Sequence, residues 1–312
     1  MKVFVAGASG AIGRPLVRQL VAAGHEVTGT TRREERAEGI RATGARAVVC
    51  DAFDAAALEG AVKAAAPEAV VHLLTALPPR LDYRAKEDPL AATNRVRGEG
   101  TRNLVAAARA AGARRLIAES VAFFYAPTGD WVKDEEAPLF QDAPPPFGAA
   151  AVALGDLENQ VLHTEGIEGT VLRYGWLYGP GTYYAHDGSL YEDAMRRRAP
   201  VVGKGAGTFS FVHVEDAASA TVAALERGNP GIYNVVDDEP APMREWAPAF
   251  AAAIGAKKPL RVPAWLARVV AGRGAVGMAT ELRGASNAKA KRELGWQPRY
   301  PAWRQGFREA LG

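Results

Sequence analysis

The sequence has a single cysteine, Cys50, and it lacks the features by which secreted and membrane proteins are recognised. One cysteine cannot form an internal disulfide, which favours a reducing compartment. No charged leader followed by an apolar core opens the chain, and no apolar run is as long as a membrane span. We therefore expect a cytoplasmic protein with no membrane partner.

The chain also lacks a large excess of charge of either sign. The 38 Lys and Arg residues against 35 Asp and Glu residues give a net charge of +3, and no long basic run marks a surface for nucleic acid. The chain has no convincing metal-ligand spacing of His, Cys, Asp and Glu, and no Gly-x-Ser-x-Gly turn of a serine hydrolase. We expect no nucleic-acid partner and no metal site.

Short apolar runs alternate with helix-like segments over the first two thirds of the chain. This pattern is typical of βαβ units, and it predicts an α/β protein with a doubly wound parallel sheet, a Rossmann fold. After residue 175 the pattern becomes irregular, with a further strand and helix in 209–228 and another strand in 231–237. The strands predicted before that point cover residues 2–7, 26–31, 45–50, 69–75, 114–120 and 169–175.

The change of pattern at residue 175 predicts two parts. We expect a dinucleotide-binding domain of residues 1–175, to which residues 211–240 return. Residues 176–210 and 241–312 would form a smaller C-terminal substrate lobe. Two segments, 126–146 and 179–189, are longer than usual connections, and such loops are either functional lids or disordered.

The segment "VAGASGAIGRPLV" is a glycine-rich turn between a predicted strand and a predicted helix. Gly7 is free to adopt the dihedral angles of the turn, Gly10 lets the backbone approach a pyrophosphate, and Gly13 permits close packing of helix on strand. Ser9 and the exposed N–H groups of the helix start would donate to phosphate. The turn predicts a dinucleotide site, and the alternative is a tight turn without a ligand.

The choice of cofactor is expected at the end of the second strand, in "GTTRREE". An NAD site places an acid there to bind the ribose 2′-hydroxyl. This chain has Thr31 followed by Arg32 and Arg33, which suit a 2′-phosphate. We therefore predict NADP, with NAD possible. In the alternative both arginines are solvated and Glu34 or Glu35 reaches the ribose.

Ligands of doubly wound folds lie beyond the carboxyl ends of the strands, so the later strand ends complete the prediction. Asp51 after the third strand would contact the adenine, or else it is a helix cap. The predicted cofactor contacts are Gly7, Ser9, Gly10, Ala11, Ile12, Gly13, Thr31, Arg32, Asp51, Leu73, Leu74, Thr75, Glu119 and Tyr174.

With these residues in place, the chain resembles the extended short-chain dehydrogenase/reductases, the NAD-dependent epimerase/dehydratase family. The resemblance implies a nicotinamide dinucleotide in the first domain, a small-molecule substrate in the smaller lobe, and a homodimer packed through two long helices. The motifs that carry it run nearly from end to end: "GASGAIG", "VVHLL", "GTRNLVAAARAAGARRLI", "LRYGWLYGPGT", "FVHVEDAA", "YNVVDDEP" and "AKRELGWQP".

The chain departs from this family where the chemistry is expected. The family uses a Tyr and a Lys one helical turn apart, and the Lys lowers the pKa of the Tyr so that it can exchange a proton. Here Phe147 and Ala151 stand at those positions. The position of the assisting Ser or Thr falls on Val121, and Arg97 stands for the usual Asn. The family's standard mechanism cannot simply be carried over.

Other polar residues near the end of the fifth strand are candidates to replace the missing pair. Tyr125 would donate a proton to a reduced carbonyl, Ser120 would polarise its oxygen, and Arg97 would stabilise developing negative charge. In the alternative, Ser120 and Tyr125 are structural hydrogen-bonding residues of the turn. His72 and His213 are expected to be structural histidines.

The substrate lobe lacks the Arg that relatives acting on nucleotide sugars carry before "FVHV", which argues against such a substrate. We predict an NADP-dependent oxidoreductase of atypical active site acting on a small, apolar carbonyl or alkene. A redox-neutral lyase, dehydratase or isomerase that retains its nicotinamide cofactor, and a non-catalytic NADP-binding sensor, are the alternatives. Five aromatic residues would suit a flat apolar substrate or would form core: Trp176, Tyr178, Tyr183, Tyr184 and Tyr191.

Overall fold

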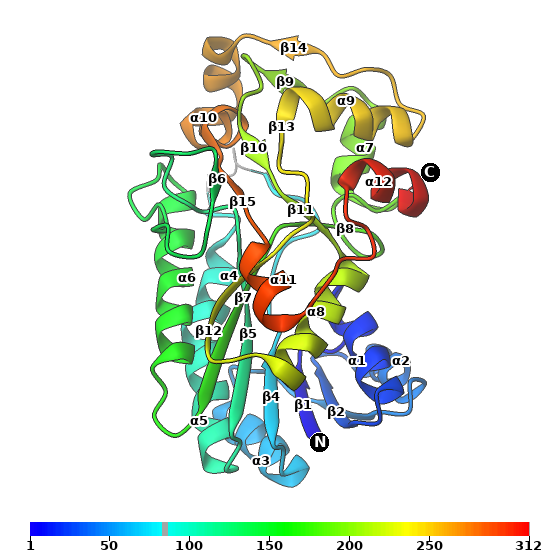
Figure 1. Cartoon of the computed structure of the whole chain (residues 1–312), viewed down its shortest axis with the longest axis vertical. Coiled ribbons are helices and arrows are strands. Elements are labelled where there is room, and N and C mark those ends of the chain that lie inside the picture. Colours follow the sequence, from blue (N-terminus) through cyan, green and yellow to red (C-terminus); the bar gives the residue numbers. More distant parts are fainter. Residues whose placement is uncertain (83–86, 312) are drawn as a thin grey trace.

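The computed structural model describes residues 1–82 and 87–311. Its larger lobe is built on a seven-stranded sheet of order β12-β7-β5-β4-β1-β2-β3, in which every pair is parallel (Figure 1). The predicted α/β doubly wound sheet is confirmed. The strands are β1 (Lys2–Ala6), β2 (Glu26–Thr31), β3 (Arg46–Val49), β4 (Ala69–His72), β5 (Arg115–Val121), β7 (Glu168–Tyr174) and β12 (Gly231–Val235).

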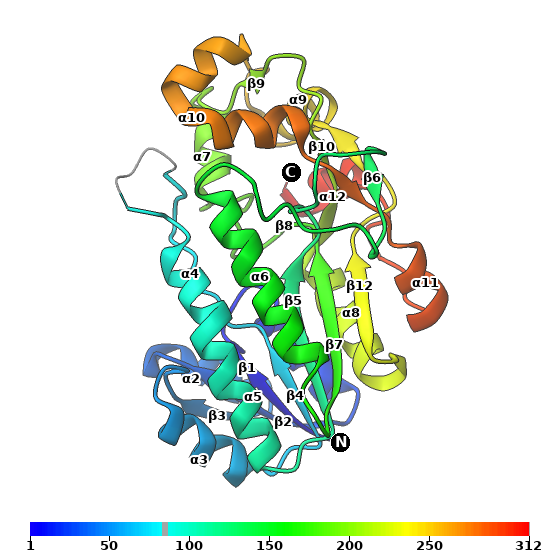
Figure 2. The same cartoon turned by 90° about the vertical axis from the view of Figure 1, so that its left-hand side faces the viewer.

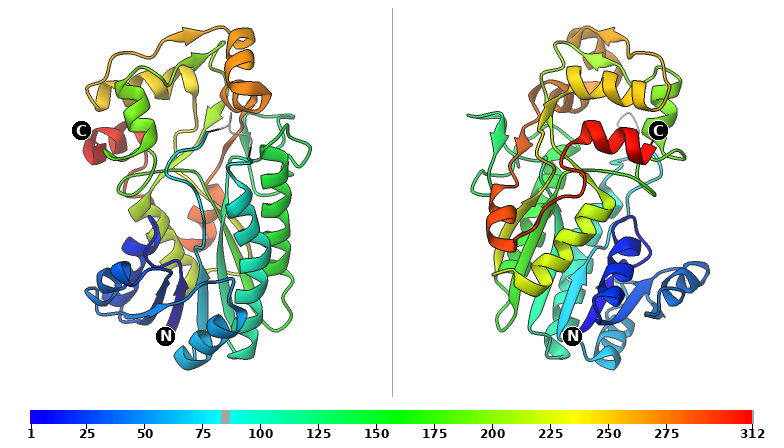
Figure 3. Two further views of the ribbon diagram at one scale, coloured as in Figure 1. Left: turned by 180° about the vertical axis from the view of Figure 1, so that it is seen from behind. Right: turned by 45° about the vertical axis from the view of Figure 1, so that its right-hand side comes forward.

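Helices cover both faces of this sheet. On one face α1 (Gly13–Ala22) packs beside α8 (Val214–Arg227), as Figure 3 shows. On the other face lie α3 (Ala55–Ala65), α5 (Thr101–Ala110) and α6 (Phe147–Leu162), with α5 and α6 in front in Figure 2. The remaining helical segments around the sheet are α2 (Glu34–Arg41), α4 (Ala91–Arg95), the π-helical turn η1 (Val96–Gly100) and α11 (Ala288–Leu294).

The local sequence accounts for these elements. In α1 the apolar residues Leu16, Val17 and Leu20 are buried on one side, and Gly24, with a φ of +83°, follows the end of the helix. All four residues of β4 are buried, because a central parallel strand has helices over both of its faces. None of the helices in the two described ranges is both long enough and apolar enough to cross a membrane.

The smaller lobe has an apolar core of its own. Tyr178 and Tyr184 are buried in it, so two of the aromatic residues considered for substrate binding pack in the core. Its helices are α7 (Ser189–Met195), α9 (Met243–Ala253), α10 (Ala264–Glu281) and α12 (Trp303–Leu311). Its short strands pair as β8 (Trp176–Tyr178) with β11 (Phe211–His213), β9 (Val201–Val202) with β14 (Arg261–Val262), β10 (Thr208–Phe209) with β13 (Ala241–Pro242), and β6 (Val132–Lys133) with β15 (Gly284–Ala285).

Candidate cofactor site and active site

The glycine-rich turn is pressed between β1, β4 and the start of α1. Gly7 has a φ of +93°, and a Cβ built on it would lie 2.5 Å from the carbonyl oxygen of Leu73. A Cβ on Gly13 would lie 2.3 Å from the carbonyl oxygen of Gly7. A Cβ on Gly10 meets only that same oxygen, at 3.2 Å, and the rest of its surroundings are open. The turn therefore fits a phosphate approaching at Gly10.

The end of β2 holds this turn in place. The backbone N–H of Ala8 donates to the carbonyl of Thr30 at 3.0 Å, and that of Gly7 donates to the Thr30 hydroxyl at 3.3 Å. The Ser9 hydroxyl donates to the Thr31 hydroxyl at 3.0 Å. The residues in the position of the ribose-binding acid are thus threonines whose hydroxyl groups bind the glycine-rich turn.

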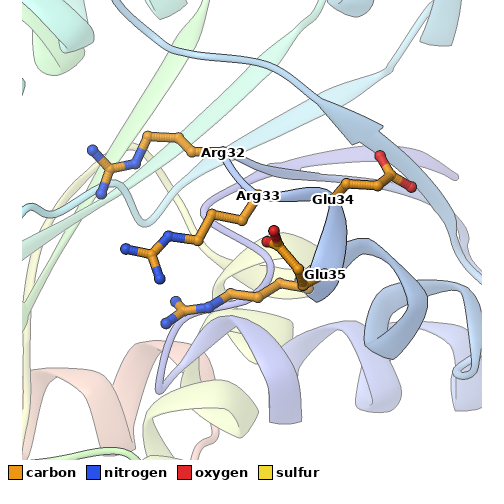
Figure 4. Close-up of a pocket in the computed structure, with 5 residues that line it drawn as sticks. Arg32, Arg33, Glu34 and Glu35 are labelled. Carbon is orange, nitrogen blue, oxygen red and sulfur yellow. The ribbon is translucent and has the colours of Figure 1, made fainter.

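An arginine-rich pocket follows β2. It is an open hollow of about 490 Å³ lined by residues 32–36, which are Arg32, Arg33, Glu34, Glu35 and Arg36. The side chains of Arg32 and Arg33 extend to the same side, and Glu34 points away from them (Figure 4). Glu34 pairs with Arg41 at 3.0 Å, whereas neither Arg32 nor Arg33 has an ion pair among the described residues. The hollow thus offers the Arg32 and Arg33 guanidinium groups to an anionic ligand, with the Glu34 and Glu35 carboxylates also in its lining.

The other predicted cofactor contacts lie at the carboxyl edge of the sheet or near it. Ala11 and Ile12 lead into α1, and Leu74 and Thr75 follow β4. The Asp51 carboxylate is exposed and accepts from the N–H of Phe53 at 3.0 Å, so it bonds the local turn. No described contact tests its role toward adenine.

Tyr174, another predicted contact, is buried at the end of β7, and its hydroxyl is 2.7 Å from that of Thr221 in α8. Arg14 directly follows the last glycine of the turn and was missed by the sequence analysis. A Cβ built on Gly181 would lie 2.3 Å from its Nη2, so the long loop 179–189 passes beside the start of α1.

Apolar side chains stand at the two positions where the family resemblance places the proton-transferring pair. Phe147 is 4% exposed and Ala151 is fully buried in one cluster with Phe124. From α10, a Cβ on Gly274 would lie 2.8 Å from the Phe147 ring, so that helix packs on the ring closely. The start of α6 is an apolar wall, and neither Phe147 nor Ala151 carries a titratable proton.

Two of the predicted residues, Glu119 in β5 and Arg97 in η1, influence each other electrostatically, although no hydrogen bond or ion pair joins them among the described residues. Burial raises the pKa of Glu119 to about 7, and the positive charge of Arg97 opposes that rise. Arg97 is 7% exposed, and burial lowers its pKa to about 10 while Glu119 raises it. Its one side-chain hydrogen bond among the described residues runs from Nη1 to Asn94 Oδ1 at 3.2 Å.

Ser120 and Tyr125 belong to a different, buried network. The Ser120 hydroxyl donates to Glu158 of α6 at 2.7 Å, and the Tyr125 hydroxyl donates to Asn234 of β12 at 2.6 Å. Arg173 of β7 joins them, because it donates to Tyr125 at 3.1 Å and to both carboxylate oxygens of Glu158. Since neighbouring side chains of a strand point to opposite faces, Ser120 faces α6 and Glu119 does not. These contacts fit the structural alternative for Ser120 and Tyr125, and their catalytic roles stay predictions.

The sequence analysis missed Arg173 and Glu158. The available signal was a charge inside an otherwise apolar stretch: Arg173 in the strand "GTVLRYG" and Glu158 on the buried side of α6. A charge at such a position needs a partner, because an unpaired buried charge is very costly. The identity of the partner required the fold.

His72 and His213 are both buried. His72 Nε2 is 2.8 Å from the Thr101 hydroxyl, and its Nδ1 accepts from the N–H of Leu74. His213 Nδ1 accepts from the N–H of Glu215 at the start of α8. Burial lowers the pKa of each to about 4. Within residues 1–82 and 87–311, no three His, Cys, Asp or Glu side chains are grouped so that they could hold a metal ion.

A model of the NAD-dependent epimerase/dehydratase family matches residues 3–235. The chain belongs to this family. Its relatives include the 3-diazoavenalumate denitrifying reductase of a Streptomyces species, 48% identical over 308 residues, which are 98% of this chain and 99% of that protein. The 2-alkyl-3-oxoalkanoate reductase of Stenotrophomonas maltophilia is 27% identical over 273 residues, 83% of this chain and 77% of that protein.

Solved structures of the same fold include UDP-glucose 4-epimerase of Thermotoga maritima. Its TM-score is 0.77 at 21% identity, covering 99% of this chain and 97% of that one. A human epimerase family protein solved with NADPH has a TM-score of 0.75 at 23% identity, covering 99% of both chains. Family and relatives together support a reductase-like, NAD(P)-dependent oxidoreductase or epimerase with a nicotinamide cofactor.

Proposed function

We propose that the protein is an NADP-dependent reductase whose hydride acceptor is a small aromatic compound carrying a diazo group. The observation that carries the proposal is the hydrocarbon at Phe147 and Ala151, where family members hold their proton donor. Reduction of a diazo acceptor consumes no net proton, so it does not depend on that Tyr and Lys pair. The relative at 48% identity, named as a denitrifying reductase of a diazo compound, supports the same class.

The preference for NADP rests on the arginine-rich pocket. Arg32 and Arg33 point to one side of the loop after β2 and have no ion-pair partner within the described part of the chain, and a 2′-phosphate would supply their counter-charge. One charge-assisted hydrogen bond contributes about 1.5–3 kcal/mol, which corresponds to roughly 10- to 150-fold in affinity.

Titration of wild type and Arg32→Ala with NADPH and NADH tests this preference. We expect Arg32→Ala to lose affinity for NADPH but not for NADH. Arg198→Ala removes an exposed arginine far along the chain, after α7, and is the matched control. Equal affinities of wild type for the two cofactors would contradict the assignment.

The balance of the reaction explains why the Tyr and Lys can be absent. When bound, NADPH supplies a hydride, so that Ar–N≡N⁺ and NADPH become Ar–H, N₂ and NADP⁺ with no further proton consumed. Reduction of a carbonyl leaves an alkoxide that must be protonated, usually by a positioned acid. An apolar wall at the start of α6 therefore suits the diazo acceptor better than the carbonyl.

Aromatic residues after β5 and β7 would bind the substrate ring. Phe123 stacks on Trp176 with 4.3 Å between ring centroids, and Phe124 lies 5.9 Å from Phe147 by the same measure. The indole N–H of Trp176 is buried and has no hydrogen-bond partner among the described residues. A polar group of the substrate would satisfy that donor, and Arg97 would attract an anionic substituent.

Turnover assays with purified protein test the acceptor. We expect NADPH oxidation with stoichiometric release of N₂ from an arenediazonium compound, Ar–N≡N⁺, whose ring also carries a carboxylate. A second candidate acceptor is the predicted small, apolar carbonyl or alkene, favoured by the oxoalkanoate reductase among the relatives. NADPH oxidation by ketones or enones alone would support it. Product formation without net NADPH consumption would support the redox-neutral alternative, and tight NADPH binding without any turnover would support the sensor.

We also propose the homodimer that the family resemblance implies, packed through two long helices. The long helix α6 keeps Val152 43% exposed, as expected of a side chain that a second copy would cover. Light scattering of wild type against Val152→Glu measures the assembly. A monomeric wild type would contradict the proposal.

A further inference from the structure

A carboxylate that accepts no hydrogen bond from the described residues lies at the carboxyl edge of the central sheet. Ala118 of β5 pairs with His72 at the end of β4, and Glu119 comes one residue later. The residue after His72 is Leu73, whose carbonyl oxygen lies against Gly7 of the glycine-rich turn. Glu119 is thus two strands away from that turn, on the edge where doubly wound folds bind their ligands.

Two groups interact electrostatically with this carboxylate among the described residues, and no hydrogen bond or ion pair joins it to either of them. The charge of Arg97 acts on it from η1, and Glu119 acts in turn on the Tyr174 phenol of β7. The Tyr174 hydroxyl is engaged by Thr221, whereas Arg97 has only its bond to Asn94. Glu119 is half-buried and has no hydrogen-bond partner among the described residues, so its carboxylate is available to a ligand.

We infer that Glu119, at the carboxyl edge of the sheet and within the electrostatic influence of Arg97, carries the proton that must move during diazo reduction, an inference that rests on the proposed function. Hydride at the outer nitrogen of Ar–N≡N⁺ yields the neutral diazene Ar–N=N–H. The Glu119 carboxylate removes the N–H proton, the C–N bond breaks, N₂ leaves, and the electron pair stays on the ring carbon. The carboxylic acid then returns a proton to that carbon, which yields Ar–H and restores the carboxylate.

The surroundings of Glu119 suit both halves of this transfer. A group that accepts and then returns a proton works best when its pKa is near the operating pH, and the pKa of Glu119 is raised to about 7. The Arg97 guanidinium stabilises the carboxylate and the negative charge that develops on the ring carbon. The transfer consumes no net proton, in agreement with the overall reaction.

Rate measurements on Glu119→Gln are the first test. We expect N₂ release from the carboxylate-bearing arenediazonium compound to fall by roughly 10²–10⁴, the usual contribution of a positioned acid or base. The Kd for NADPH should stay unchanged. The matched control is Glu165→Gln, which neutralises an exposed carboxylate between α6 and β7 and should keep the wild-type rate. A wild-type rate in Glu119→Gln would overturn the inference.

The origin of the new C–H hydrogen is the second test. In D₂O with unlabelled NADPH, the carboxyl proton exchanges with solvent, so we expect deuterium at the ring carbon that carried the diazo group. A product that carries mainly the hydrogen of the cofactor, in wild type and equally in a fully active Glu119→Gln, would show direct transfer to carbon and overturn the inference.

A third test needs neither cofactor nor turnover. The infrared band of the protonated Glu119 carboxyl should titrate near pH 7 and be missing in Glu119→Gln. Arg97→Gln should move its midpoint upward, because a positive charge that favours the carboxylate is lost. Titration in the ordinary range of glutamate would overturn the inference.

The tests separate this inference from the proposed function. If wild type reduces no diazo arene, the proposed acceptor and the role of Glu119 fall together. If wild type turns over and Glu119→Gln is equally active, only the role of Glu119 falls.

Discussion

Removal of Arg173 should destabilise the protein strongly, because it leaves the Glu158 carboxylate buried without its counter-charge. The two side chains are 5% and 6% exposed, and Arg173 Nη2 is 2.6 Å from Glu158 Oε2. A second bond joins Arg173 Nε to Oε1 at 2.8 Å. In Arg173→Leu the Ser120 hydroxyl would be the one donor to that carboxylate left among the described residues. Breaking a buried pair costs about 3–5 kcal/mol of unfolding free energy.

The double variant Arg173→Leu/Glu158→Leu separates the cost of an unpaired charge from the net contribution of the pair. Replacing both partners by apolar residues is often close to neutral, so we expect the double variant to be more stable than Arg173→Leu alone. The exposed pair of Arg114 and Glu68, with side chains 76% and 42% exposed, is the matched control. Arg114→Leu should cost less than about 1 kcal/mol.

Urea unfolding followed by circular dichroism and tryptophan fluorescence measures these free energies. An Arg173→Leu variant within about 1 kcal/mol of wild type would refute the assignment of a stabilising buried pair. A double variant as unstable as the single one would refute the claim that the unpaired Glu158 carboxylate is the cause.

Three further outcomes follow from the geometry. Gly10→Val should fold and lose dinucleotide binding, whereas Gly13→Ala should destabilise the fold, since its Cβ would lie 2.3 Å from a backbone oxygen. Calorimetry with NADPH measures the binding, and urea unfolding measures the stability. Binding of NADPH by Gly10→Val would contradict the proposed site. Tyr125→Phe should cost about 1–2 kcal/mol of stability through its two lost hydrogen bonds, with turnover within a few-fold of wild type. A rate loss of roughly 10²–10⁴ would instead restore Tyr125 as the proton donor. His72, with its pKa lowered from 6.5 to about 4, should make stability fall as the pH drops through that window, because the unfolded chain binds a proton that the folded chain does not. His72→Asn should flatten this slope in urea unfolding measured at several pH values, and an unchanged slope would exclude His72 as its source.

Local patterns were sufficient to predict the framework of the site. The central strands lie within two or three residues of their predicted ranges, and the glycine-rich turn follows β1 as expected. The turn could be located because Gly7 must adopt a positive φ and Gly13 must allow close packing, which are properties of single residues and their spacing. The sequence also predicts that apolar residues replace the proton-transferring pair, since Phe147 and Ala151 carry no titratable group.

Only the tertiary structure decided which polar residues share a neighbourhood. Glu119 and Ser120 are adjacent in sequence, yet Ser120 bonds Glu158 of α6, whereas Glu119 has no hydrogen bond among the described residues and is influenced by the charge of Arg97. Strand alternation separates the two side chains, but it does not tell which helix covers which face, because the crossover connections set that arrangement. The partner of Tyr125 is Asn234, 109 residues further along the chain. This contact exists because β12 pairs with β7 in the sheet. Local sequence patterns do not tell which distant strands pair, and so they could not predict the contact.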